Sequence, residues 1–185
     1  PSYARSGTPS SEALEKAIAA LEGADHAIVT SSGLSAIVTS MLAFLNSGDH
    51  VLMVDSAYGP TRRFCDLELK RLGIETTYYD PCIGAGISAL IRKNTKVVFI
   101  ESPANPNLEI LDIKFIAKLC KKHQASLIVD NIFASPFAQK PFELGADIVV
   151  YSTTKHLEGQ GRTLGGCVLG SEDFIKNTLL PFHRH

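Results

Sequence analysis

Apolar runs of strand length alternate with helix-like segments along the whole chain. The runs are rich in Val and Ile and mostly lack polar alternation, which is typical of strands that are covered on both faces. They predict strands at residues 26–30, 50–55, 75–80, 96–101, 126–131, 147–151 and 167–170. Strands that alternate with helices in this way indicate an α/β fold with a mostly parallel sheet flanked by helices.

The segments between the strands have the apolar periodicity of helices. They predict helices at residues 10–21, 33–45, 60–72, 83–91 and 113–123. Ser10 and Ser11 carry hydroxyls that can cap the first of these helices. In parallel sheets, ligands bind at the carboxyl ends of the strands. The candidate ligand-binding positions are therefore the polar residues that directly follow the predicted strands.

One of these positions is a lysine within a hydroxyl-rich turn, Ser152-Thr153-Thr154-Lys155-His156. Upstream, the apolar run of the predicted strand 126–131 ends in Asp130. Pyridoxal phosphate needs a lysine amine that forms a Schiff base with its aldehyde and a carboxylate that pairs with its protonated pyridine nitrogen. The hydroxyls beside Lys155 can donate to its phosphate. A lysine after a strand is more often only solvated. The other parts of the site therefore decide whether Lys155 is a cofactor-binding residue.

Two further turns carry groups that suit the same cofactor. Gly33 and Leu34 open a helix after the first predicted strand, where free N–H groups bind phosphate well, although an ordinary helix cap has the same pattern. Tyr58 follows the predicted strand 50–55, where its ring can stack on a flat cofactor and its hydroxyl can transfer protons. The ordinary alternative is a half-buried tyrosine in a turn.

Two loops complete the candidate site. Asn105 lies between two prolines after the predicted strand 96–101, and its amide can face a ligand or only belong to a rigid loop. The glycine-rich segment 159–166 lacks the Gly-Lys-Ser/Thr sequence of a nucleotide-binding P-loop and opens no helix. We interpret it as a mobile loop over Lys155.

Composition narrows the classes of function. The chain has 185 residues, 45% of them hydrophobic, which suits one domain. A formal net charge of −1 without a long basic run makes nucleic acid an unexpected partner, and no apolar stretch reaches the roughly 20 residues of a membrane span. Four scattered cysteines indicate free thiols in the cytoplasm, and the histidines do not cluster with them as zinc ligands, so no metal is expected.

Taken together, these segments resemble the pyridoxal-phosphate-dependent Cys/Met-metabolism family, the trans-sulfuration enzymes, over nearly the whole chain. The resemblance rests on seven motifs: Tyr3-x-Arg5-x-Gly7, Ser32-Gly33-Leu34-Ser35-Ala36, Gly48-Asp49-His50-Val51, Tyr58-Gly59-Pro60-Thr61, Glu101-Ser102-Pro103, Asp130-Asn131 and Ser152-x-Thr154-Lys155. It implies the large cofactor-binding domain of the aspartate-aminotransferase (type I) fold. We expect residues 1–185 to be this domain, a piece that lacks most of the N-terminal arm and the C-terminal domain.

The resemblance also implies a role for each site residue. Lys155 would carry pyridoxal 5'-phosphate, Asp130 would pair with its ring nitrogen, and Tyr58 would stack on the ring. The phosphate would be held by two hydroxyls and two backbone N–H groups, those of Ser152, Thr154, Gly33 and Leu34. Tetramers built from dimers would bring Tyr3 and Arg5 to the phosphate of the neighbouring subunit. The arginine that grips the substrate carboxylate would lie in the C-terminal domain, outside this chain.

Within the family the resemblance is mixed, and it leaves the reaction open. Segments 58–66 and 80–87 resemble cystathionine β-lyases, which favours cleavage of cystathionine to homocysteine, pyruvate and ammonia. Segments 159–166 and 180–185 resemble O-succinylhomoserine sulfhydrylases, and 105–107 resembles cystathionine γ-synthases and γ-lyases. Ile132 departs from the Thr that many members carry. An aminotransferase of the same fold and a non-catalytic fragment remain as further alternatives.

Overall fold

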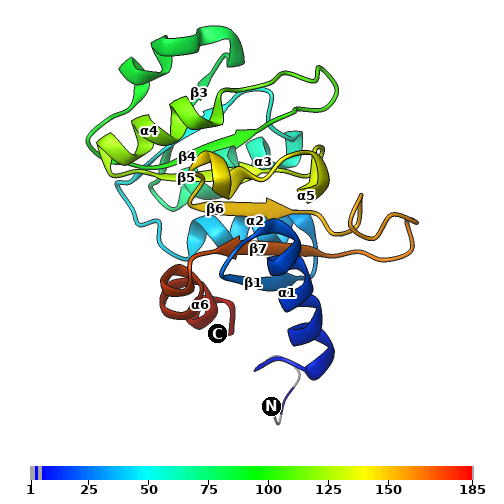
Figure 1. Cartoon of the computed structure of the whole chain (residues 1–185). Coiled ribbons are helices and arrows are strands. Elements are labelled where there is room, and N and C mark those ends of the chain that lie inside the picture. The colour runs from blue at the N-terminus through cyan, green and yellow to red at the C-terminus, as the bar shows by residue number, and fades with distance from the viewer. Residues whose placement is uncertain (1–2, 4–5, 185) are drawn as a thin grey trace.

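The computed structural model describes residues 3 and 6–184, and within them a seven-stranded sheet forms the centre of the molecule (Figure 1). The strand order is β1-β7-β6-β5-β4-β2-β3. The strands are β1 (His26–Thr30), β2 (His50–Val54), β3 (Glu75–Tyr79), β4 (Thr95–Glu101), β5 (Ser126–Asp130), β6 (Ile148–Tyr151) and β7 (Gly166–Gly170). Only β7 runs antiparallel to its neighbours in this sheet, so the other six strands end at one common edge. The predicted α/β fold with a mostly parallel sheet is confirmed.

Helices cover both faces of this sheet. In Figure 1, α2 lies behind the sheet, whereas α1 and α4 lie in front of it. The α-helices are α1 (Pro9–Glu22), α2 (Gly33–Leu42), α3 (Gly59–Phe64), α4 (Ile113–His123), α5 (Ser135–Ala138) and α6 (Leu180–Arg184). Shorter π and 3₁₀ turns are η2 (Cys65–Leu69), η3 (Pro81–Leu90), η4 (Pro141–Leu144) and η5 (Phe174–Leu179).

The core consists of the central strands and the helix faces packed on them. Every residue of β2 and β7 is buried, and so are all residues of β4 except Lys96. The uninterrupted Val and Ile runs of the sequence thus correspond to strands covered on both faces, as expected. Among the described residues, no helix has the length and apolar character needed to cross a membrane.

Two details of the predicted helices were wrong. The cap of α1 is Thr8 rather than Ser10: its Oγ1 accepts from the Ser11 N–H at 3.1 Å, while the Ser11 Oγ accepts from the Thr8 N–H at 2.9 Å. This reciprocal pair starts the helix at Pro9, whose missing N–H costs nothing there. The segment predicted as a helix at 83–91 is instead the 3₁₀ segment η3, interrupted where Gly84 adopts φ 55° and ψ −128°.

Candidate cofactor site

A cavity of about 690 Å³ opens at the common edge where the parallel strands end. Its walls come from the segments that follow β1, β2, β4, β5 and β6, so residues far apart in the sequence meet there. Eight residues of the predicted site line it: Gly33, Leu34, Tyr58, Asn105, Asp130, Ser152, Thr154 and Lys155. Parallel strands explain this gathering, because their carboxyl ends lie side by side.

Asp130 forms a buried acidic group in this cavity. It ends β5, it is 6% exposed, and its Oδ1 accepts from the Ile132 N–H at 3.1 Å. Burial, and secondarily the negative charge of Glu101, raise the pKa of Asp130 to about 8. A buried carboxylate in these surroundings is costly unless a cation pairs with it. Asp130 therefore favours a ligand that brings a protonated nitrogen.

Glu101 is a second buried carboxylate in the cavity, and its role was not predicted from the sequence. It pairs in register with Asp130 at the ends of β4 and β5. Its Oε2 accepts from the Tyr58 N–H at 2.8 Å, which ties the turn after β2 to the end of β4. Burial raises the pKa of Glu101, and the N–H groups of Tyr58 and Asn105 oppose that rise. Glu101 thus fixes the backbone of two predicted cofactor-binding residues.

The opening turn of α2 approaches the segment after β6 closely. Ser32 caps the helix by accepting from the Ser35 N–H at 3.1 Å, a bond that uses neither the Gly33 nor the Leu34 N–H. A Cβ placed on Gly33 would lie 2.5 Å from the Ser152 Cβ and 2.9 Å from its Cα. Only glycine permits this approach, which brings a helix N-terminus and the Ser152 hydroxyl to one side of the cavity. Such a cradle suits an anion.

We therefore expect Gly33→Ala to weaken cofactor binding by about tenfold or more, since the new methyl group must push the helix start away from Ser152; a displacement of this kind costs about 1–3 kcal/mol. Titration of the cofactor-free protein with pyridoxal 5'-phosphate measures the affinity, and circular dichroism shows that the variant is folded. A folded variant with wild-type affinity would contradict the cradle.

Lys155 follows β6 by four residues, is exposed, and lines the cavity together with residues of the glycine-rich segment 159–166. The turn that carries it is bonded to that segment: the Thr154 Oγ1 accepts from the Gly165 N–H at 2.9 Å and donates to the Gly165 carbonyl at 3.1 Å. Gly159 and Gly161 line the same cavity, and the Gly159 N–H donates to the Lys155 carbonyl at 2.8 Å. The segment between β6 and β7 projects beyond the sheet edge in Figure 1.

One predicted site residue lies elsewhere, and another is not described. Arg5 is outside the described residues. Tyr3 is 65% exposed, does not line the cavity, and its carbonyl accepts from the Ser6 N–H at 2.9 Å. Ser6 in turn accepts from Arg184 of α6 at 2.9 Å, so Tyr3 lies near the C-terminal helix rather than at the carboxyl ends of the strands.

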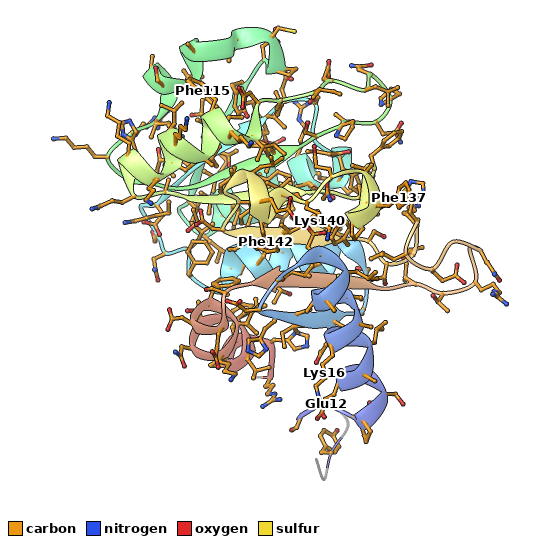
Figure 2. The ribbon with its side chains drawn as sticks, viewed as in Figure 1. Glu12, Lys16, Phe115, Phe137, Lys140 and Phe142 are labelled. Carbon is orange, nitrogen blue, oxygen red and sulfur yellow. The ribbon has the colours of Figure 1, made fainter. Side chains whose placement is uncertain are left out.

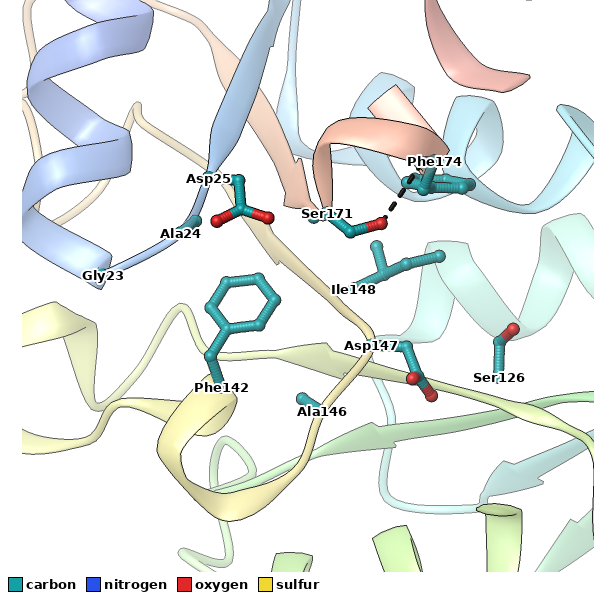
Figure 3. Close-up of a pocket in the computed structure, with 11 residues that line it drawn as sticks. Gly23, Ala24, Asp25, Ser126, Phe142, Ala146, Asp147, Ile148, Ser171 and Phe174 are labelled. Atoms are coloured by element: carbon teal, nitrogen blue, oxygen red, sulfur yellow. Dashed lines mark hydrogen bonds between the residues drawn. The ribbon is translucent and has the colours of Figure 1, made fainter. Parts of the chain in front are cut away.

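A second cavity of about 460 Å³ lies at the opposite edge of the sheet, where β5 and β6 begin (Figure 3). Its two carboxylates already serve the backbone: Asp147 accepts from the Leu127 N–H at 2.8 Å, and Asp25 accepts from the Glu172 N–H at 3.4 Å. None of the predicted site residues that the structure describes lines it. The chemistry of the chain is therefore concentrated in the cavity of Lys155 and Asp130.

The residues of that cavity fit pyridoxal phosphate. The buried Asp130 has no cation among the charged groups that shift its pKa, and a protonated pyridine nitrogen would supply one. The close approach of Gly33 to Ser152 leaves an anion cradle on one wall. Lys155 brings an amine to the same space.

Comparison with known proteins agrees with this geometry. Residues 2–184 match the family model described as Cys/Met metabolism PLP-dependent enzyme. The chain belongs to this family. The predicted family, its cofactor pyridoxal phosphate and its enzymatic character are thereby confirmed.

Relatives within the Cys/Met-metabolism family carry different activities. An O-succinylhomoserine sulfhydrylase of Pseudomonas aeruginosa is 42% identical over 96% of this chain and 44% of its own length. A cystathionine gamma-lyase of Bacillus subtilis is 43% identical over 95% of this chain and 48% of its own length. Cystathionine beta-lyase MetC of Bacillus subtilis is 44% identical over 89% of this chain and 42% of its own length. The mixed resemblance within the family is confirmed, and the chain spans less than half the length of these relatives.

Solved structures show the same fold. The crystal structure of metB from Corynebacterium glutamicum superposes with a TM-score of 0.95 at 40% identity, over 98% of this chain and 47% of that one. A metY structure from Campylobacter jejuni, which contains N'-pyridoxyl-lysine-5'-monophosphate, superposes with a TM-score of 0.88 at 35% identity, over 95% of this chain and 44% of that one. The predicted type I fold of the family is confirmed.

Proposed function

We propose that the protein is a pyridoxal-phosphate-dependent carbon–sulfur lyase of sulfur amino-acid metabolism, which cleaves cystathionine to homocysteine, pyruvate and ammonia. The observation that carries the proposal is the meeting of Lys155 and the buried Asp130 in one cavity with the Gly33 cradle. An amine, a buried carboxylate and an anion cradle are the three groups that this cofactor requires.

Each residue has a defined task in this proposal. The bound cofactor supplies an electron sink for the bond that breaks at the substrate. Asp130 would hold a proton at the ring nitrogen, and Tyr58, which is 55% exposed, would cover the ring. The Nζ of Lys155 removes the proton from the α-carbon of the substrate as general base. The hydroxyl of Tyr58 is the second candidate for proton transfer.

The second candidate function is replacement at the γ-carbon, with sulfide displacing succinate from O-succinylhomoserine. It is favoured by the 42% identical sulfhydrylase and by the resemblance of segments 159–166 and 180–185 to O-succinylhomoserine sulfhydrylases. Both routes begin with the same proton removal by Lys155, and they diverge in how the site holds the rest of the substrate. The γ-synthase, γ-lyase and aminotransferase activities are less favoured alternatives.

A pair of assays on the full-length protein separates these functions. Cystathionine cleavage is followed by the release of pyruvate, and the sulfhydrylase reaction by sulfide-dependent formation of homocysteine from O-succinylhomoserine. The proposal expects pyruvate release without added sulfide. Homocysteine formation from O-succinylhomoserine and sulfide alone would replace it with the second candidate. Cofactor binding without any turnover would indicate the non-catalytic alternative.

The same proposal includes a homo-oligomer, a dimer of dimers, in which Tyr3 and Arg5 complete the site of the neighbouring subunit. The position of Tyr3 outside its own cavity supports this arrangement. Phe137 of α5, labelled in Figure 2, is 99% exposed, and Ile110 is 76% exposed. Large exposed apolar side chains of this kind suit a subunit interface.

Scattered cysteines without a disulfide-like pattern support a cytoplasmic location.

Mixing the Arg5→Ala and Lys155→Ala variants tests the exchange of Arg5 between subunits. Arg5→Ala is expected to weaken cofactor affinity, since a guanidinium is a bidentate phosphate ligand. Lys155→Ala is expected to be inactive. In a mixed dimer, one site combines a native Lys155 with a native Arg5 from the other chain, so activity should return in part. Mixed dimers that form without regaining activity would show that Arg5 does not serve the neighbouring site.

A further inference from the structure

A buried polar network lies beside the cofactor cavity and begins at Glu22, the last residue of α1. Glu22 is 0% exposed, and its Oε2 accepts a hydrogen bond from the Tyr151 hydroxyl. Tyr151 is the last residue of β6 and is 1% exposed. These two residues are 129 positions apart in the sequence, so the bond joins the first helix to the end of a central strand.

The network continues from Tyr151 to the ends of two more strands. The Asn131 side-chain amide donates to the Tyr151 hydroxyl at 2.5 Å. The Gln139 amide donates to the Asn131 Oδ1 and to the Ser102 carbonyl, both at 2.7 Å. The donors thus run in one direction, from Gln139 through Asn131 and Tyr151 to Glu22, which is the final acceptor.

Three members of the network directly adjoin residues that line the cavity. Ser102 follows Glu101, Asn131 follows Asp130, and Tyr151 precedes Ser152. Neighbouring residues of an extended chain direct their side chains to opposite faces. The network holds the backbone next to the two predicted cofactor ligands. Of its members, Tyr151 also lines the cavity, whereas Glu22, Ser102, Asn131 and Gln139 do not.

We propose that Glu22 is a positioning residue of the cofactor site, which acts through Tyr151 and Asn131 to hold Asp130 and Ser152 in place. The inference rests on the proposed cofactor-binding roles of these two residues. Glu22 fixes the direction of the chain: because Tyr151 donates to Glu22, its oxygen lone pair is left for the Asn131 amide. Without an acceptor at position 22, the buried Tyr151 hydroxyl has no acceptor for its proton, and its contact with the Asn131 amide loses its orientation.

The Glu22 carboxyl group can accept the hydrogen bond from Tyr151 in both of its protonation states. Charged and titratable groups face it from several elements. Lys140 and Glu143 act on it from the segment around η4, Tyr151 from β6 and Cys167 from β7; Lys140 is labelled in Figure 2. Burial raises the pKa of Glu22 to about 7, opposed by Tyr151 and by Lys140. The Glu22 Oε1 has no hydrogen-bond partner among the described residues, so a proton there leaves Oε2 an acceptor. A glutamine can keep the same acceptor.

The test compares three substitutions in the full-length protein. Glu22→Leu removes the acceptor, Tyr151→Phe removes the hydroxyl that links it to Asn131, and Glu22→Gln keeps an acceptor oxygen. We expect the first two to raise the dissociation constant for pyridoxal 5'-phosphate about tenfold, equal to about 1.4 kcal/mol, and Glu22→Gln to change it by less than about threefold. The double variant Glu22→Leu/Tyr151→Phe should have a dissociation constant no higher than that of the single variant with the lower affinity. Both substitutions break the same hydrogen-bond chain, so their effects should not add.

Glu15→Leu is the matched control. Glu15 lies two turns earlier on α1 and also accepts a backbone hydrogen bond, from the Val29 N–H at 3.1 Å, but it does not line the cavity. This variant should lower thermal stability without changing the dissociation constant. Wild-type cofactor affinity in Tyr151→Phe, or equal losses in Glu22→Leu and Glu15→Leu, would overturn the positioning role. Failure of the wild-type protein to bind the cofactor would instead refute the proposed function.

Discussion

Replacing Lys155 with alanine is expected to abolish covalent attachment of the cofactor and to lower turnover by at least about 10²- to 10⁴-fold, the usual contribution of a positioned general acid or base. Lys155 is the one lysine that lines the cavity within the described part of the chain. The phosphate cradle and Asp130 remain in this variant, so it should still bind the cofactor without a covalent bond. Absorbance after gel filtration measures binding, and product release measures turnover.

Lys96→Ala is the control for this change. Lys96 is the single exposed residue of β4 and lies outside the cavity, so its loss should leave cofactor attachment and turnover unchanged. If Lys155→Ala retained a covalently bound cofactor, or turned over within about tenfold of wild type, the assignment of Lys155 would be wrong.

Replacing Asp130 with asparagine should leave some cofactor binding and remove most of the activity. A neutral amide cannot hold the ring nitrogen protonated, so the electron sink weakens as charge develops. A hydrogen bond to a charged group contributes about 1.5–3 kcal/mol, which equals about 10- to 150-fold in rate if it is felt mainly in the transition state. The rate of product release at saturating cofactor measures this loss.

Asp147→Asn is a matched control for that experiment. Asp147 is also an aspartate whose pKa is raised by burial, but it lies in the cavity at the opposite edge of the sheet. Asparagine keeps an oxygen that can accept from the Leu127 N–H, so the replacement should change stability little and leave the rate at saturating cofactor near wild type. Near wild-type turnover in Asp130→Asn, or equal losses of turnover in both variants, would refute the role of Asp130.

Asp130 also predicts a pH dependence of the cofactor-free protein. Its pKa is about 8 in the folded state, against an ordinary value of 3.8, because burial disfavours the charged form. The folded state therefore holds a proton that the unfolded state releases, and the contribution of Asp130 to stability is lost as pH rises from about 4 to about 8. Thermal unfolding of Asp130→Asn should show a shallower decline over this range. An unchanged decline would contradict the raised pKa.

The sheet was predictable from the sequence because its strands are unbroken Val and Ile runs. All seven predicted strands agree with the structure to within one residue at each end. The site followed from the same pattern, since polar residues after parallel strands gather at one edge. Lys155, Asp130 and Tyr58 line one cavity for that reason.

Other features depend on contacts that local sequence does not encode. Glu101 did leave a signal, a carboxylate at the end of an apolar strand, but its bond to the Tyr58 N–H spans 43 positions. Glu22 left none: at the end of an amphipathic helix it resembles a solvated residue, and only its bond to Tyr151 shows otherwise. The break of η3 at Gly84 likewise depends on one backbone conformation rather than on periodicity.

Borohydride reduction of the full-length protein with its cofactor, followed by peptide mapping, tests the central claim most directly. Reduction fixes the cofactor permanently to whichever lysine carries it. The structure predicts a pyridoxyl group on the peptide that contains Lys155, between Ser152 and the glycine-rich loop. A pyridoxyl group on Lys140 or Lys96 instead, or on no lysine at all, would contradict the account.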